Sequence, residues 1–219
     1  MNNDFQSEKI KLEPNSKPYL LKRIISDGFD TVVIFLLFFT ISIFIFSTPL
    51  AKTYNEHYDN CTKVTNKDDS VIERFGDDSE AIKRYYDEER FAANLHSFIL
   101  KALAGFIAEA IILLVFPLVS STKSTPGKML TGIMPFCEKK QTKASGRLIF
   151  RRFAFIFIID SVFLYLYTGI FTFILVPIIR LMEMLLNQKN KTLCDAITGI
   201  TMIEKISYDG IDKHQEEQL

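Results

Sequence analysis

The sequence predicts an all-α integral membrane protein, a four-pass helical bundle built as a duplicated helical hairpin, with a possible small cytoplasmic β element. Two apolar stretches, about 24–46 and 98–119, each reach the roughly 20 residues that a helix needs to span the hydrocarbon core. A third apolar region covers 153–186, and a short motif repeats at an offset of 67 residues. Of the 219 residues 48% are hydrophobic but 24% are charged, which indicates polar segments between lipid-facing ones.

The third apolar region is too long for one straight crossing. Its 34 residues would form a helix of about 51 Å, against a hydrocarbon core of about 30 Å. Thr168 and Gly169 near its middle, and Pro177 beyond them, are places where a helix can break. We therefore expect two short passes, 153–168 and 170–186, with a single pass as the alternative.

The repeated motif favours a duplicated hairpin. Residues 125–133 (TPGKMLTGI) return as 192–200 (TLCDAITGI). Each pair of apolar stretches also opens with a basic doublet followed by an acid: Lys22-Arg23 with Asp30, and Arg151-Arg152 with Asp160. Parallel duplications of this kind are common in membrane transport folds. A chance match is the alternative, because Thr-Gly-Ile is short and the chain is rich in both isoleucine and threonine.

Loop charges predict the sidedness of the spans, because lysine and arginine gather in short cytoplasmic loops. Residues 122–152 hold eight basic side chains and one acid, so this loop should be cytoplasmic. Residues 51–95 hold seven basic and eleven acidic side chains and should form an extracytoplasmic insertion. The membrane domain, 21–206, would then lie between cytoplasmic tails (1–20 and 207–219) in a plasma or inner membrane.

Both loops show patterns of secondary structure. In the acidic loop, residues 70–73 have capping-box spacing and apolar residues recur at helical intervals, which predicts short amphipathic helices. A solvated linker is the alternative. Residues 129–137 of the basic loop, before a polar turn at 138–141, and residues 200–206 are typical of short extended segments, and we expect them to pair as a small sheet. Here the alternative is a disordered loop on anionic lipid.

Asp30 is an acid inside the first span. It lies two helical turns after Arg23 on the same face, with Asp27 between them. A carboxylate in lipid costs about 2.5 to 3.5 kcal/mol, so it should face protein or water and have a partner. Arg23 is the nearest same-face cation, and we expect the two to interact. Both a structural pairing and a direct role in ion passage remain open.

Further charges lie in the other spans. Glu109 is near the centre of the second span, where it needs a buried partner, a hydrated path or a proton. Lys101 can extend to the outer surface. Arg180 and Glu183 have the spacing of a local ion pair. Intramembrane acids are candidate functional groups, and a cation or proton path could connect three of them: Asp30, Glu109 and Asp160.

Several of these residues together resemble the RDD family of membrane proteins, which is named after one Arg and two Asp. The resemblance covers about 20–49 and 95–206, and it rests on Arg23, Asp30, the Thr125-Pro126-Gly127-Lys128 turn with Leu130 and Gly132, and Leu193 to Asp195 with Gly199. It implies that Arg23, Asp30 and Asp195 are the family positions, and Cys194 stands where the family usually has His. It also implies a membrane fold and, for some members, suspected ion transport.

The repeat makes one specific prediction about charge pairing. Superposing its copies places Lys128 on Asp195, and a duplicated hairpin could bring these opposite charges together on the cytoplasmic face. The alternative is that Asp195 caps or turns the chain beside Thr192 while Lys128 binds lipid phosphate.

Other classes of function have little support. The net charge is +0 and nothing favours nucleic acid. The chain has no phosphate-binding glycine loop or nucleophile elbow, and His57, His96 and His214 are scattered, so we expect no enzyme, cofactor or metal. The expected partners are the lipid bilayer, a small cation or proton, and a second copy of the chain. The two candidate functions are ion or proton-coupled transport and a non-transporting scaffold or assembly factor that holds partner proteins.

Overall fold

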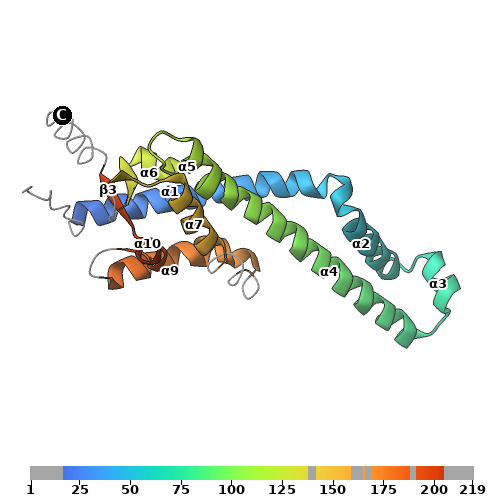
Figure 1. Cartoon of the computed structure of the whole chain (residues 1–219). Coiled ribbons are helices and arrows are strands. Elements are labelled where there is room, and N and C mark those ends of the chain that lie inside the picture. The colour runs from blue at the N-terminus through green and yellow to red at the C-terminus, as the bar shows by residue number, and fades with distance from the viewer. Residues whose placement is uncertain (1–16, 138–141, 159–164, 166–168, 188–190, 205–219) are drawn as a thin grey trace, which may run out of the picture. The chain divides into compact units, whose positions relative to one another are not determined.

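The computed structural model in Figure 1 describes residues 17–137, 142–158, 165, 169–187 and 191–204. They fall into two compact units, a core unit (Met1–Ile34 with Glu109–Leu219) and a hairpin unit (Phe35–Ala108). The first helices are α1 (Lys17–Phe46), η1 (Pro49–Ala51), α2 (Lys52–Thr65), α3 (Asp69–Phe75), α4 (Ser79–Ala110), the π-helical turn η2 (Ile111–Val115) and α5 (Phe116–Val119). The remaining elements are α6 (Pro126–Leu130), β1 (Ile133–Cys137), β2 (Thr142–Lys143), α7 (Gly146–Ile156), η4 (Gly169–Phe171), α9 (Thr172–Leu186), α10 (Leu193–Thr198) and β3 (Ile200–Glu204).

Two helical segments are long and apolar enough to cross a membrane, Tyr19–Phe46 and Ser79–Val119. They contain the first two spans predicted from the sequence. The second runs without interruption from the loop 51–95 into the apolar stretch, through the π-helical turn that precedes Pro117. In the third apolar region, α9 has 15 residues, fewer than the roughly 20 that a span needs. The four-pass count therefore stays a prediction.

The part of α1 in the core unit has the reverse of the polarity expected in a soluble protein. Its exposed face is apolar, with Leu21, Ile25 and Val32 each more than half exposed. Its buried face is polar and carries Arg23, Ser26 and Asp30, none more than 3% exposed. Water would not stabilise this arrangement, whereas lipid around the helix and polar contacts inside the protein would.

Gly169 interrupts the third apolar region, as the sequence predicts. Its φ of +57° lies in the left-handed region that glycine adopts without a Cβ clash. The short η4 follows, and α9 then runs through Pro177 to Leu186. Pro177 therefore lies inside α9 and does not end it. Asp160 lies outside the described residues.

The predicted small sheet is present with strand order β2-β1-β3, and both pairings are antiparallel. The first strand begins at Ile133, four residues later than predicted, because Pro126 starts helix α6 and the helix extends to Leu130. Tyr19 of α1 donates a hydrogen bond to the Met202 carbonyl of β3 and packs in the apolar cluster beside the sheet.

The two copies of the repeat have the same local structure. Each begins with an extended threonine, at φ −71° for both Thr125 and Thr192, and continues as a short helix. A left-handed glycine, Gly132 or Gly199, follows each helix within two residues and leads into a strand. In the sheet Pro135 pairs with Met202, its own counterpart in the repeat, so a local two-fold axis relates the copies. Duplication of the whole hairpin stays a prediction.

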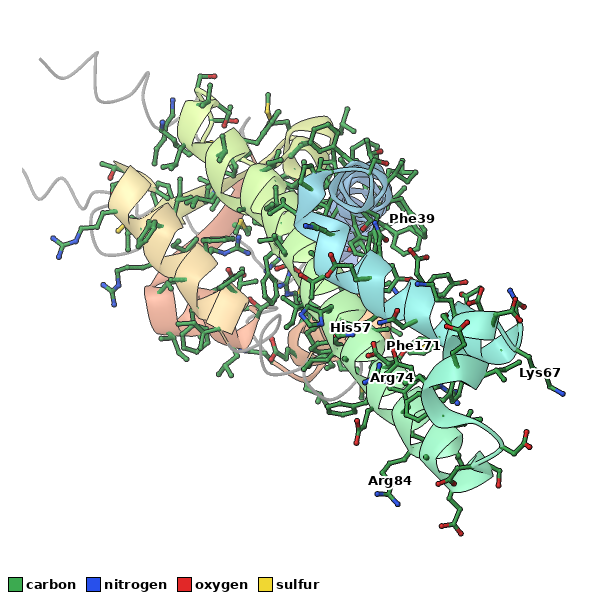
Figure 2. The ribbon with its side chains drawn as sticks, turned by 90° about the vertical axis from the view of Figure 1, so that its right-hand side faces the viewer. Phe39, His57, Lys67, Arg74, Arg84 and Phe171 are labelled. Carbon is green, nitrogen blue, oxygen red and sulfur yellow. The ribbon has the colours of Figure 1, made fainter. Side chains whose placement is uncertain are left out.

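The hairpin unit contains the helices predicted for the acidic loop. The cap of α3 is Asp68, whose side chain accepts a hydrogen bond from the Ser70 backbone, so the predicted capping box at 70–73 is wrong. The aspartate lies before the first helical residue, where its carboxylate can accept a free backbone N–H, whereas Ser70 lies inside the helix. The Arg74 guanidinium lies 5.0 Å from the ring centres of both Phe75 and Tyr85. Figure 2 labels Arg74 in the hairpin unit.

Candidate functional site: a buried charge cluster

The buried polar face of α1 forms one side of a charge cluster inside the core unit. Arg23, Asp27 and Asp30 project from this face at spacings of four and three residues. The other side comes from the first turns of α6 and α10 and from α7. Segments more than 90 residues apart in sequence therefore meet at one helix face.

Asp195 of α10 is the most buried acid in the cluster, with no exposed surface. Arg23 donates to its Oδ2 atom and Arg152 of α7 donates to its Oδ1 atom, each at 2.7 Å. One carboxylate thus joins three helices through two charge-assisted hydrogen bonds. Burial favours the neutral acid, but the two arginines outweigh this effect and hold the Asp195 pKa well below its usual range.

Local structure fixes the position of this carboxylate. Thr192 caps α10 and accepts a hydrogen bond from the Asp195 backbone N–H at 3.2 Å. The neighbouring Cys194 is buried and lies 3.4 Å from the Arg152 carbonyl oxygen through its Sγ atom. Cys194 therefore packs directly against the backbone of Arg152.

Asp30 has three partners, all from the first turn of α6. Its Oδ1 atom accepts the Gly127 backbone N–H at 2.7 Å, and its Oδ2 atom accepts the Thr125 hydroxyl. The Lys128 ammonium lies 3.5 Å from the same Oδ2 atom. These contacts satisfy a carboxylate that is only 3% exposed, as its depth in the span requires.

Lys128 lies between two acids. Its Nζ atom is 2.9 Å from Asp27 Oδ1 and 3.5 Å from Asp30 Oδ2, and it is 3.4 Å from the Thr125 hydroxyl. The lysine is 4% exposed. An ammonium can be buried to this extent because two carboxylates and a hydroxyl replace its water.

Two small cavities adjoin the cluster. One of about 20 Å³ is lined by Asp27, Asp30, Thr31, Ile34, Leu113, Lys128, Arg152 and Arg180. The other, of about 30 Å³, is lined by Asp27, Arg152, Phe155, Ile156, Arg180, Glu183, Thr192, Leu193 and Cys194. Each has room for about one water molecule or small ion. Asp27, Arg152 and Arg180 line both cavities and so lie between the two halves of the cluster.

Two predicted ion pairs are wrong. Arg23 pairs with Asp195 and not with Asp30, because α6 fills the space around Asp30. Lys128 pairs with Asp27 and Asp30 and not with Asp195, which both arginines enclose. In each case the sequence identified a charged residue correctly but the fold supplies a different partner.

The other predicted site residues have varied surroundings. Glu109 is 4% exposed and interacts with another group of the protein. It lies one helical turn before Leu113, which lines the smaller cavity. Lys101 is exposed. In the described part of the chain Arg180 and Glu183 form no ion pair with each other, since the Glu183 carboxylate accepts the Leu193 backbone N–H at 3.0 Å.

Two members of the cluster were not predicted as site residues. Arg152 is the second residue of the second basic doublet, and its role could have been found by comparing this doublet with Lys22-Arg23. Thr125 occupies the cap of α6, but its hydroxyl donates to Asp30 instead of capping its own helix. The spacing of residues along the sequence does not predict this hydrogen bond between Thr125 and Asp30.

Comparison with known proteins supports the family. No curated protein and no solved structure matches the chain. The model of the RDD family matches residues 17–199, which include every member of the cluster. Arg23, Asp30 and Asp195, the residues predicted to be the family's Arg and two Asp, all lie in the cluster. This chain is a member of the RDD family, with the membrane helices that such a protein requires.

Proposed function

We propose that this protein carries protons or a monovalent cation across the membrane by exchange at Asp27, Asp30 and Lys128. The observation that carries the proposal is the burial of the Lys128 ammonium between the two carboxylates, beside a cavity of about 20 Å³. Asp27 and Asp30 lie in the first membrane span, and ionisable groups within membrane spans are costly to maintain and commonly mark ion paths.

The chemistry of the three groups suits such an exchange. Two carboxylates and the Thr125 hydroxyl present oxygen atoms, which are the ligands that hard cations prefer. The Lys128 ammonium now occupies the position between them. Loss of its proton would leave a neutral amine and two uncompensated carboxylates, and a monovalent cation entering the site would restore the charge. One proton would then leave for each cation bound.

Glu109 has a separate place in this proposal. It lies one turn from Leu113, which lines the cavity together with Ile34. These two side chains form the apolar part of the cavity lining. We propose that Glu109 carries protons or cations on the side of Leu113 that faces away from the cavity. Asp160, which the sequence predicts as a third acid on the path, lies outside the described residues.

Flux in proteoliposomes tests the exchange. Wild-type protein should couple a pH gradient to sodium or potassium movement, read out by an internal pH dye and by the isotope of each ion. Asp27→Asn, Asp30→Asn and Glu109→Gln should abolish the flux, because each removes a carboxylate that the path requires. Lys128→Gln should let the cation move without proton movement, because the exchangeable proton is lost.

Controls separate transport from folding. Asp30 is almost fully buried, and its variant could fail to fold, whereas the Asp27 side chain is 19% exposed and should tolerate Asn. Glu204→Gln removes an acid from the exposed Lys22 pair and should leave the flux unchanged. Wild-type flux equal to that of empty liposomes would disprove transport. Normal flux in properly folded Asp27→Asn and Lys128→Gln proteins would leave transport but reject this site.

A second candidate function, a scaffold that holds partner proteins, has its own observation. The hairpin unit contains a largely polar helical insertion, α2 to α4, that exceeds what a simple connection between two spans requires. Deleting 52–78 and joining the chain with a short glycine-serine linker should leave flux intact in a transporter. Loss of flux would show that the insertion takes part in transport. A full-length protein without flux that loses a co-purifying partner on this deletion would favour the scaffold.

Cysteine labelling tests the proposed sidedness. Cys137 and Cys194 are buried, so their failure to react with an impermeant maleimide would not reveal their side of the membrane. The exposed repeat counterparts Met129 and Ala196 provide a better pair. In a background without other cysteines, Met129→Cys and Ala196→Cys should react only after the membrane is opened, whereas native Cys61 should react in intact cells. Labelling of Ala196→Cys from outside would imply an odd number of spans.

A further inference from the structure

The hairpin unit brings together two histidines that the sequence leaves scattered. His57 lies on α2 and His96 lies on α4, and their ring centroids are 5.4 Å apart at an interplanar angle of 31°. Figure 2 shows His57 where α2 lies against α4. Both side chains are partly exposed, and the His57 side chain is 27% exposed. A small ion can therefore reach the pair from solvent.

Hydrogen bonds fix the same tautomer in both rings. His57 Nδ1 is 2.6 Å from Glu89 Oε2, and His96 Nδ1 is 2.9 Å from the Ala92 carbonyl oxygen. A carbonyl and an ionised carboxylate only accept hydrogen bonds, so each Nδ1 atom must carry the proton. In the neutral rings, both Nε2 atoms therefore keep their lone pairs.

This is the hydrogen-bond pattern of metal-binding histidines, which donate their other N–H to a carboxylate or a backbone carbonyl. Asn60 and Tyr85 lie next to Glu89 and hold that carboxylate in place. The surrounding insertion, residues 51–95, has eleven acidic and seven basic side chains, which favours the approach of cations.

We propose that His57 and His96 bind one divalent first-row transition metal ion, Cu²⁺ or Zn²⁺, through their Nε2 atoms. Imidazole nitrogen suits these metals, and Cu²⁺ binds the more tightly of the two. No group of three or more metal-binding side chains gathers in the described part of the chain, so water completes the coordination. The ion would link α2 to α4, and Glu89 would act as the positioning residue for His57.

The site predicts a specific pattern of affinities. Purified full-length protein in detergent is titrated with CuCl₂ or ZnCl₂ alone and followed by calorimetry, with one ion expected per chain. His57→Ala or His96→Ala should each lower the affinity at least about tenfold, and Glu89→Gln should lower it by on the order of tenfold. His214→Ala, which removes the third histidine of the chain, is the matched control and should have no effect.

Spectroscopy of the copper-loaded protein gives a second readout. Electron paramagnetic resonance should show two nitrogen ligands in wild type and in His214→Ala, but only one in each of the other histidine variants. Equal affinity in the wild type and in the His57→Ala/His96→Ala double variant would overturn the proposal. Binding that depends on one histidine only would also overturn it, because the proposal requires both. His57 and His96 are remote in sequence from the charge cluster. The flux measurements therefore neither support nor overturn the metal site.

Discussion

Asparagine in place of Asp195 is expected to destabilise the folded protein strongly. The carboxylate has no exposed surface and accepts one hydrogen bond from each of two arginines at 2.7 Å. Without it, the buried Arg23 guanidinium and the Arg152 guanidinium, whose side chain is 14% exposed, would have no carboxylate between them. Removing one side of a buried ion pair costs about 3 to 5 kcal/mol, a large part of the about 5 to 15 kcal/mol that stabilises a typical protein.

Thermal unfolding of purified protein in detergent measures this effect. Glu204→Gln is the matched control, because it removes an acid from a salt bridge of 2.9 Å whose side chains are 43% and 33% exposed. Such a pair contributes only about 0 to 1 kcal/mol. Combining Asp195→Asn with Arg152→Gln should recover part of the lost stability by removing one of the uncompensated charges. Equal melting temperatures for Asp195→Asn and Glu204→Gln would contradict the role assigned to Asp195.

The features that the sequence predicts well are local ones. The first two spans follow from runs of apolar residues, and the break at Gly169 follows from its conformational freedom. The extended segments predicted at 129–137 and 200–206 contain β1 and β3. In each case the signal lies within a few residues of the structure that it predicts.

Pairing partners could not be predicted in the same way. Spacing correctly places Arg23 and Asp30 on one face of α1, but it does not show which distant segment covers that face. The partner of Arg23 lies 172 residues away, and the partners of Asp30 lie about 95 to 98 residues away. These contacts depend on how α6 and α10 pack, which depends in turn on the sheet that follows each of them.

The same limit applies to the histidines. His57 and His96 belong to different helices, and neither has a metal-ligand motif in the sequence around it. Their approach depends on the packing of α2 against α4, and their tautomers depend on Glu89 and Ala92. A motif search finds ligands close together in sequence, and this pair is close only in space.

Alanine in place of Gly127 is expected to disrupt the contact between α6 and α1. A Cβ atom at this position would overlap the Ser26 carbonyl oxygen and would lie 2.9 Å from Asp30 Oδ1. The backbone of Gly127 has no positive φ, so alanine itself could adopt the conformation. The effect must therefore come from the clash. A backbone carbonyl in the middle of a helix cannot move aside, so α6 would have to shift and the 2.7 Å bond from Gly127 N to Asp30 would lengthen or break.

Gly28 provides the control on the same helix as Ser26. A Cβ atom there would meet nothing within 4 Å, and alanine should stabilise α1 by about 0.5 to 1 kcal/mol relative to glycine. For Gly127→Ala we expect a loss of about 1 to 3 kcal/mol, the usual cost of forcing extra atoms into a packed site. In thermal unfolding in detergent, the melting temperature of Gly28→Ala should therefore lie above that of wild type, and that of Gly127→Ala should lie below it. A Gly127→Ala protein that melts at or above the wild-type temperature would show that α6 does not press against α1 at Ser26, and that the partners assigned to Asp30 need revision.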